Sequence, residues 1–339
     1  MIKYIGSKRK LITEVVNSIS AVTPPGGLVV DLFSGTSRVG YALKKDAFSV
    51  HSNDYNAFSY TLADCYVVGN PETHAREAQM LIDELGSLAG NPGYFTQKFC
   101  IESRYFQPKN GERIDAIREA IEQKSLPPRL KSILLVSLME AADRVDSTVG
   151  IQMAYLKSWA PRAHNELQLR LPPLIPPIDS CTYSASQADA EVCASRVSCD
   201  TLYLDPPYNS HSYLGNYHIW ESLVSWDKPD TYGVANKRVD CRERKSDFNF
   251  KRKSFGALEA VLSSADFKAA VMSYSDEGHI PINDLVSLLG RFGSVDYQAI
   301  AYARHIGHKI GKYGPDGSKS SSPDGRSRNT EYLFTLRRL

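Results

Sequence analysis

Two short segments that have the pattern of strands, separated by just enough chain for one helix, constrain the fold of this chain most strongly. Residues 28–33 (LVVDLF) are rich in β-branched side chains, which suits a strand buried on both faces. Small residues at 34–37 make a tight loop, 39–45 have helical periodicity, and 48–54 form the next strand. A strand, a helix and a second strand in this order form a βαβ unit. We therefore predict an α/β fold with a parallel sheet covered by helices.

A long helical block follows this unit and continues to about residue 170. Strand signals are few there, and the proline-rich run 171–178 cannot continue a helix. That run is a plausible domain boundary. The clearest helical segments of the block are His74–Leu88, Gly111–Gln123 and Arg129–Arg144.

Strand patterns return in the second half of the chain. Residues 201–204 and 269–274 are apolar and short, and 294–303 and 331–336 are typical of a final antiparallel pair. The intervening loop, 307–327, is rich in Gly, Ser and Lys and is expected to be mobile without a ligand. The sequence thus predicts a sheet interrupted by a helical insertion.

Composition excludes several classes of protein. Hydrophobic residues make up 42% and charged residues 23%, which is ordinary for a globular protein. No apolar run approaches the ~20 residues that span a bilayer, and the basic start leads into no signal-peptide core. The six cysteines include no C-x-x-C pair, so we expect reduced thiols rather than zinc ligands or disulfides. A cytoplasmic location is the default expectation.

Positive charge is concentrated in two stretches of a near-neutral chain. The net charge is only +2, yet 237–253 holds eight Lys or Arg against three acidic residues, and 302–328 holds six against two. Such stretches fit a surface that meets phosphates, although a solvated helix face gives the same pattern.

The most informative motif is D-P-P-Y at 205–208, directly after an apolar strand. Two successive prolines have no N–H, so this turn presents only hydrogen-bond acceptors: the carboxylate of Asp205 and the carbonyl of Pro206. Pro207 fixes the turn, and Tyr208 offers a ring face for stacking. The turn suits a planar aromatic amine, whose nitrogen becomes more nucleophilic when acceptors hold its two N–H groups.

A second group of residues suits a bulky cofactor at the strand ends. Asp31 and Phe33 end the first strand, and Gly35 lets a ligand approach the backbone. Asp31 is placed to accept from an ammonium group, and Asp54, at the end of the next strand, from ribose hydroxyls. Asp189 is placed to accept from an adenine amine. Taken alone, Asp54 and Asp189 fit ordinary loop carboxylates equally well. The dinucleotide G-x-G-x-x-G pattern is absent.

Together with K-Y-I-G-S-K at 3–8, these motifs resemble the Dam-type adenine-N6 DNA methyltransferases over residues 3–56 and 189–278. The segment 209–218 is similar to a branch found in restriction–modification systems. The family often has a second glycine where Ser37 stands, and the helical block matches nothing in it. The resemblance implies a catalytic turn and a set of cofactor contacts. The turn is Asp205, Pro206, Pro207 and Tyr208, and the cofactor contacts are Tyr4, Lys8, Asp31, Phe33, Gly35, Asp54, Asp189 and Asp205.

The resemblance also implies a fold and partners. The expected fold is a Rossmann-like methyltransferase core with a mixed sheet, from 1–56 and 180–339, and a helical target-recognition insertion at 57–179. The expected cofactor is S-adenosylmethionine, with no metal, and the expected substrate is an adenine flipped out of double-stranded DNA. A cognate restriction endonuclease is a possible partner. Candidate DNA contacts are Lys237, Arg238, Lys251, Arg252 and Lys253.

Three alternatives stay open on the sequence. The chain could methylate RNA or a protein glutamine, since related turns serve other planar amines. It could also be a non-catalytic DNA-binding protein that retains such a core. Asp205 at the head of the turn, with Tyr4 and Lys8, favours DNA adenine, and an intact Asp205 and Tyr208 argue for catalysis.

Overall fold

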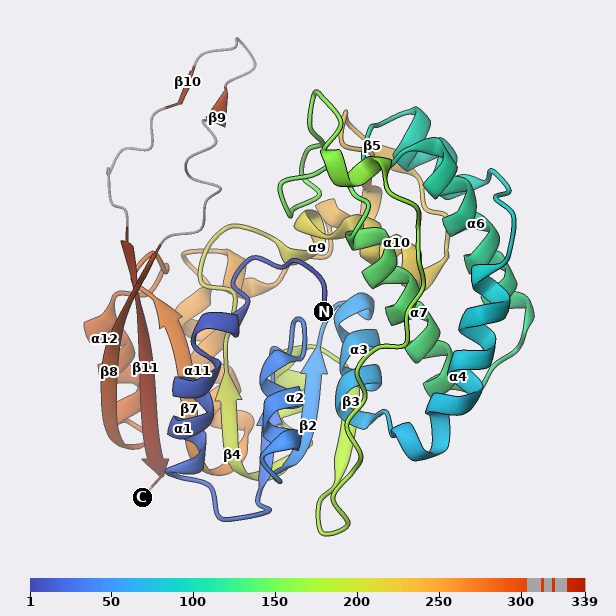
Figure 1. Ribbon diagram of the computed structural model, residues 1–339. Helices are drawn as coiled ribbons and strands as arrows, with labels where there is room; N and C mark the ends of the chain where they lie inside the picture. Colours follow the sequence, from blue (N-terminus) through green and yellow to red (C-terminus); the bar gives the residue numbers. More distant parts are fainter. Residues whose placement is uncertain (304–311, 314–318, 321–327, 339) are drawn as a thin grey trace.

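A computed structural model describes residues 1–303, 312–313, 319–320 and 328–338 of the chain. Its centre is a seven-stranded mixed sheet with the order β3-β2-β1-β4-β7-β11-β8 (Figure 1). The strands from β3 to β7 are parallel, and β11 runs antiparallel to β7 and β8. The sheet strands are β1 (Leu28–Asp31), β2 (Ser49–Asp54), β3 (Tyr183–Gln187), β4 (Ser198–Leu204), β7 (Asp266–Ser275), β8 (Gly293–Ala303) and β11 (Arg328–Arg338). The predicted α/β fold with a mixed sheet is confirmed, including its final antiparallel pair.

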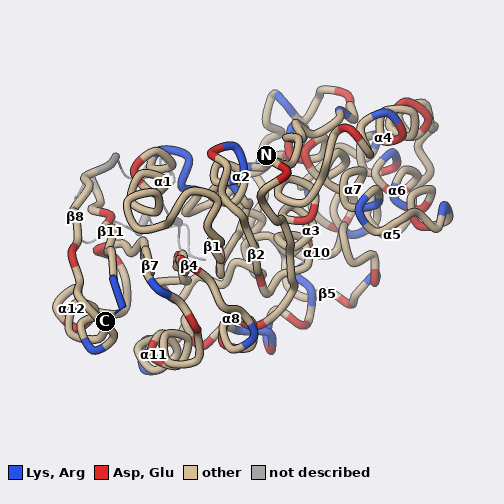
Figure 2. Tube along the Cα trace, turned by 90° about the horizontal axis from the view of Figure 1, so that it is seen from below, with Lys and Arg blue, Asp and Glu red and all other residues tan. Residues whose placement is uncertain are grey.

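Helices cover both faces of this sheet (Figure 2). Alternate residues of a strand point to opposite faces, so Val29 packs in one core cluster and Val30 in the other. The helices of one face are α1 (Ile12–Ser20) and α2 (Arg38–Lys45); those of the other are α8 (Ala190–Ala194), α11 (Ser254–Ser264) and α12 (Ile282–Gly290). Burial on both faces explains the continuous apolar runs of the central strands.

A helical cluster lies beside the β3 edge of the sheet (Figure 1). Its helices are α3 (Ala57–Ala63), α4 (Pro71–Gly86), α5 (Tyr94–Thr96), α6 (Pro108–Gln123), α7 (Pro128–Asp143), α9 (Tyr213–Asn216) and α10 (His218–Ser225). Proline occupies the first position of α4, α6 and α7, where its missing N–H has no helical partner to lose. The sequence predicted these three long helices within a few residues.

The core of this helical cluster draws on two separate stretches of chain. Trp220 and Leu223 of α10 are buried with Phe58 and Leu62 of α3 and with Leu138 of α7. Helix α10 comes after the D-P-P-Y turn, so the chain enters the helical cluster twice. Short pairs complete the architecture: β5 (Thr231–Tyr232) with β6 (Lys237–Arg238), and β9 (Lys312–Tyr313) with β10 (Lys319–Ser320).

Several expectations from composition can be compared with the structure. All six cysteines are free, and five of them are buried. No helix of the described residues is long and apolar enough to cross a membrane. The same part of the chain holds no group of His, Cys, Asp and Glu suited to a metal ion. Most of the loop 307–327 and most of the basic stretch 302–328 lie outside the described residues, so the expected mobility of that loop is not tested.

Candidate active site

Three carboxylates meet where the central parallel strands end. Asp31 ends β1, Asp54 ends β2, and Asp205 follows β4, and these strands are neighbours in parallel register. A cavity of about 590 Å³ opens at this edge, within the range of small-molecule sites. All eight predicted cofactor residues line it: Tyr4, Lys8, Asp31, Phe33, Gly35, Asp54, Asp189 and Asp205.

Asp31 is buried at the carboxyl end of β1 with little compensation for its charge. It is 1% exposed, and neither carboxylate oxygen makes a well-formed hydrogen bond within the described residues. Burial raises the pKa of Asp31 well above its usual range, Asp205 and Asp54 raise it further, and the Gly40 amide opposes this only weakly. A buried acidic group of this kind is suited to a cationic ligand.

Asp54 is bound on both of its oxygens. Oδ2 accepts from the amide of Gly35 at 2.9 Å, and Oδ1 accepts from the backbone and side chain of Asn56 at 2.9 and 3.1 Å. Burial raises the pKa of Asp54, and these hydrogen bonds oppose the rise. Asp54 therefore fixes the glycine loop while its carboxylate still lines the cavity.

The loop between β1 and α2 has two residues with a left-handed backbone. Gly35 has φ +50°, and a Cβ there would come within 3.2 Å of the Tyr4 ring. Ser37, at φ 58° and ψ 26°, precedes α2 and is fully buried. The glycine that the related family often has at this position is therefore explained by backbone conformation.

Two further predicted residues have structural partners at the cavity wall. Asp189 caps α8 by accepting from the amide of Glu191 at 2.9 Å. Phe33 meets the ring of Phe248 edge-on, with centroids 5.1 Å apart. Phe248 also lines the cavity, and the sequence pattern did not single it out. Its only signal was an aromatic residue inside a basic stretch.

Tyr4 is the middle ring of a three-tyrosine stack. Its centroid lies 5.1 Å from Tyr213 and 4.6 Å from Tyr217, with nearly parallel planes. The Tyr217 hydroxyl accepts from the amide of Ile5 at 2.6 Å. The stack attaches the N-terminal segment to α9 and to the start of α10, and both Tyr213 and Tyr4 line the cavity. Neither Tyr213 nor Tyr217 was singled out from the sequence.

Lys8 lies between two carboxylates in the interior. Its Nζ is 2.9 Å from Oδ1 of Asp205 and 2.7 Å from Oε1 of Glu331 on β11. Burial tends to lower the pKa of Lys8, but Asp205 and Glu331 reverse this and raise it well above the ordinary value. Burial raises the pKa of Asp205 to about 6, Lys8 lowers it, and Glu331 adds to the rise. The sequence analysis did not single out Glu331. The feature that could have indicated it is an acidic residue at the start of the apolar run 331–336.

The D-P-P-Y turn contributes unequally to the cavity wall. Asp205 and Pro207 line it, and Pro206 is buried. Within the described residues, Tyr208 packs against the sheet core, 6.1 Å from the ring of Tyr274. Burial raises the pKa of Tyr213 well above its usual value, and Tyr208 adds to the rise electrostatically.

The predicted DNA-contacting residues divide into two groups. Lys251, Arg252 and Lys253 are exposed, and the last two line the mouth of the cavity. Arg238 is buried, and its guanidinium forms ion pairs with Asp227 at 2.7 Å and Asp240 at 3.0 Å.

Because its charge is already neutralised, Arg238 has a structural role in the described residues, and we do not retain it as a phosphate contact. Lys237 is half-buried, and burial lowers its pKa. Arg244 and Lys245, in the same basic stretch, line the cavity although they were not singled out.

Comparison with known proteins gives one family model, the D12 class N6 adenine-specific DNA methyltransferases, which matches residues 4–287. Type II methyltransferase M.NlaIII of Neisseria lactamica is 32% identical over 89% of this chain and 91% of its own length. Modification methylase StsI of Streptococcus sanguinis is 30% identical over 91% of this chain and 50% of its own. Type II methyltransferase M.FokI of Planomicrobium okeanokoites is 31% identical over 86% and 47%.

The chain spans about half the length of these last two relatives. Among solved structures, a magnesium protoporphyrin IX methyltransferase from Synechocystis PCC 6803 with bound SAM aligns with 98% of this chain and 80% of its own. The sequence identity is 10% and the TM-score 0.35.

Proposed function

Because the chain belongs to the D12 class N6 adenine-specific DNA methyltransferases, we propose that it modifies a specific double-stranded DNA site for a restriction–modification system. S-adenosylmethionine is the methyl donor of this family, and the reaction is that of the site-specific, adenine-specific DNA methyltransferases. The observation that carries the proposal is the pairing, in one cavity, of an uncompensated Asp31 with an Asp205 whose carboxylate follows β4. One acid suits a cationic donor, and the other suits an amine acceptor.

The cavity residues fit the proposed cofactor. Asp31 would accept from its ammonium group, because that carboxylate is buried and lacks a well-formed hydrogen bond within the described residues. Asp54 would accept from the ribose hydroxyls and Asp189 from the adenine amine, while Phe33 and Gly35 would form the wall beside the adenosine. Tyr4 and Lys8 would close the N-terminal side. When bound, the cofactor supplies a sulfonium methyl group that a nitrogen lone pair can attack.

The D-P-P-Y turn would hold the target amine. Asp205 and the Pro206 carbonyl would accept its two N–H groups and favour a nitrogen lone pair aimed at the methyl donor. Pro207 keeps the turn free of donors. Tyr208, with Tyr213 close by, would supply ring faces for an extruded base, offsetting the few kcal/mol that unstacking costs. Holding the reacting groups in line would contribute much of the rate.

The outer surface of the same site would bind DNA. Lys251, Arg252 and Lys253 are exposed beside the cavity mouth, and Lys237 is a weaker candidate. We assign sequence recognition to the helical region at 57–179, which lies beside the site across the N-terminal segment (Figure 1). A cognate endonuclease and a cytoplasmic location are part of this proposal, because the relatives are named as modification methylases.

The catalytic assignment is tested by Asp205→Asn, which keeps the shape of the side chain but removes the carboxylate. We expect methyl transfer to DNA to fall at least ~10³-fold, with duplex binding within a few-fold of wild type. The readout is tritium transfer from labelled cofactor to duplex DNA, with RNA and protein offered in parallel. Full activity of Asp205→Asn, or transfer to RNA or protein in preference to DNA, would contradict the proposal.

The DNA surface is tested by changing Lys251, Arg252 and Lys253 together to Ala. The slope of log Kd against log salt should become shallower by roughly two to three charges, since each phosphate contact releases counterions. Lys45→Ala and Lys268→Ala form the control, because these exposed cations lie in the last turn of α2 and near the start of β7, at the end of the sheet opposite the cavity. An unchanged slope in the triple variant would place the DNA surface elsewhere.

The biological assignment is tested in cells. DNA from cells expressing the chain should carry N6-methyladenine at one short sequence, mapped by single-molecule sequencing, and should resist an endonuclease that cuts there. Methylation spread over unrelated sequences would contradict a restriction–modification role.

A further inference from the structure

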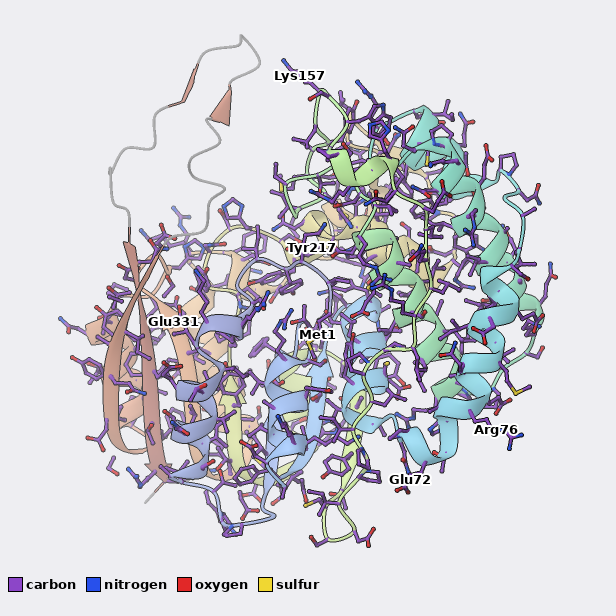
Figure 3. All side chains as sticks on the ribbon, viewed as in Figure 1. Met1, Glu72, Arg76, Lys157, Tyr217 and Glu331 are labelled. Carbon is purple, nitrogen blue, oxygen red and sulfur yellow. The ribbon has the colours of Figure 1, made fainter. Side chains whose placement is uncertain are left out.

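Glu331 is a buried carboxylate to which neither the sequence nor the proposed chemistry assigns a role. It lies on β11, opposite Ser275 of β7, and is 2% exposed. Oε1 of this one side chain meets both the ammonium of Lys8, at 2.7 Å, and the hydroxyl of Ser273, which donates to it. Figure 3 shows Glu331 on the antiparallel side of the sheet, away from the N-terminal end of the chain. The contact therefore joins the two ends of the sequence at the active site.

Lys8 is the group through which Glu331 reaches the reaction. The same ammonium lies 2.9 Å from Oδ1 of Asp205, so one positive charge serves two buried carboxylates. Pairing both partners within hydrogen-bond distance fixes the position of Lys8 better than either partner alone. It also leaves the trio with one net negative charge at the point where β4 enters the D-P-P-Y turn.

We propose that Glu331 is a positioning residue for methyl transfer: it holds Lys8 against Asp205 and takes up part of the lysine's charge, so that Asp205 remains a good acceptor for the adenine amine. This inference rests on the proposed role of Asp205 as that acceptor. Without Glu331, the full lysine charge would act on Asp205 and weaken it as an acceptor. Without Lys8, two buried carboxylates would face each other unpaired, at a large cost in stability.

Charged and titratable groups face Asp205 from several elements. Lys8 approaches from the 3₁₀ turn Lys8–Lys10 and Glu331 from β11, while Asp31 faces it from β1. Tyr203, Tyr4 and Tyr213 also interact electrostatically with the Asp205 carboxylate. Of these groups, Lys8 lowers the pKa of Asp205 and Glu331 raises it, and burial sets the overall value of about 6. The two partners therefore act on Asp205 with opposite signs.

Because Lys8 and Glu331 shift the pKa of Asp205 in opposite directions, their variants should move the pH profile in opposite directions. A residue that acts through packing alone would not move it. The ionised form of Asp205 accepts the amine, so activity is lost as the pH falls through its pKa. Glu331→Gln removes a negative charge, which should lower that pKa and move the acidic limb of the rate profile to lower pH by roughly one unit. Lys8→Met removes the positive charge, which should move the same limb to higher pH. The rate of Glu331→Gln on the plateau should fall roughly tenfold, because Asp205 becomes a weaker acceptor.

The experiment measures single-turnover methyl transfer to duplex DNA, at saturating DNA and cofactor, across the acidic and neutral range. Because Lys8→Met could fail to fold, the double variant Lys8→Met/Glu331→Gln is included, which removes one charge of each sign. Its acidic limb should lie between those of wild type and Lys8→Met, since Lys8 acts on Asp205 more strongly than Glu331 does. The expected order of midpoints, from low to high pH, is Glu331→Gln, wild type, double variant, Lys8→Met.

Ser273→Ala is the matched control. It removes the neutral hydrogen-bonding partner of the same Glu331 oxygen and leaves every charge in place, so its limb should coincide with that of wild type. If Glu331→Gln and Ser273→Ala lose rate alike and neither limb moves, Glu331 is a packing residue and the inference fails. If Asp205→Asn retains activity, the proposed function itself fails, which is a separate outcome from an unmoved limb in an enzyme that depends on Asp205.

Discussion

Two aspartates are buried to the same extent in different parts of the molecule and are treated in opposite ways. Asp115, in the helical cluster, is 2% exposed and accepts from the amides of Gly93, Phe95 and Thr96 and from the Thr96 hydroxyl. Asp31, at the sheet edge, is 1% exposed and has no well-formed hydrogen bond among the described residues. The two side chains are therefore almost equally buried, but only Asp115 has well-formed hydrogen bonds.

The difference distinguishes a carboxylate that builds the fold from one that awaits a ligand. Buried polar groups are nearly always satisfied, so an unsatisfied one indicates a function. Arg118, a cation buried in the helical cluster, is satisfied in the same way as Asp115, because it donates to the carbonyls of Leu223 and Val224. Asp115 is thus satisfied within the helical cluster, whereas we expect Asp31 to gain its partner when the cofactor binds.

The largest expected effect comes from breaking the satisfied site. Asp115→Ala removes the acceptor for three backbone amides and should lower the free energy of unfolding by about 3 kcal/mol or more. Urea denaturation followed by circular dichroism measures it. Asp83→Ala, an exposed carboxylate of α4 that accepts from Gln79, is the control and should change stability by less than about 0.5 kcal/mol. A similar small effect for Asp115→Ala would remove the contrast.

Substitution of Asp31, the unsatisfied aspartate, should weaken cofactor binding instead of reducing stability. Asp31→Asn keeps the size of the side chain and should weaken S-adenosylmethionine binding by about 2–3 kcal/mol, roughly 30- to 150-fold. Isothermal titration calorimetry measures the affinity. Asp200→Asn, at the opposite end of β4 and paired with Lys268, should bind with wild-type affinity. Equal affinities for Asp31→Asn and wild type would show that the carboxylate meets no cation.

The same variant should show a pH-dependent gain in stability without cofactor. Burial raises the folded-state pKa of Asp31 above its unfolded value, so its contribution is favourable below the unfolded pKa and is lost as the pH rises through the folded one. At neutral pH, Asp31→Asn should therefore be more stable than wild type by about 1–2 kcal/mol. The gap should close as the pH falls toward ~4, the unfolded pKa of an aspartate. Thermal melts across pH test this, and a gap that widens toward acid would contradict it.

Short, local patterns in the sequence predicted the acidic edge of the sheet. The apolar runs of β1 and β4 and the mixed strand β2 each end in or lead to an acid. The order of strands and acids therefore places Asp31, Asp54 and Asp205 together at the carboxyl ends of the strands. Glu331 could not be placed in this way, because its partner Lys8 lies 323 residues away and only the register of β11 brings them together. The local sequence at 213–217 likewise does not predict that Tyr213 and Tyr217 stack on the ring of Tyr4.

Two other differences have physical causes. Helix α10 looked like part of the sheet-bearing half, but its buried Trp220 and Leu223 complete the helical cluster. Arg238 looked like a phosphate contact within a run of basic residues. Its guanidinium is buried and forms ion pairs with two carboxylates nearer the surface, Asp227 and Asp240. Charge patterns in a sequence do not reveal which cations are already paired.

The smallest expected effect is a change in stability from variants of the loop between β1 and α2. It tests whether the backbone of this loop is strained. Ser34 and Ser37 are both buried, and neither hydroxyl has a partner among the described residues. Only Ser37 has a positive φ, 58°. In that conformation a Cβ costs about 1 kcal/mol, which glycine avoids, so Ser37→Gly should raise the free energy of unfolding by up to about 1 kcal/mol.

Ser34→Gly should do the reverse, lowering stability by about 0.5–1 kcal/mol, because glycine there gains only unfolded-state entropy. Chemical denaturation of the two variants measures the difference in sign. The cofactor affinity of Ser37→Gly should stay at or above that of wild type, since the backbone path is kept. If the two variants change the free energy of unfolding in the same direction, the positive φ of Ser37 carries no strain. The unsatisfied groups at this end of the sheet would then be side chains alone.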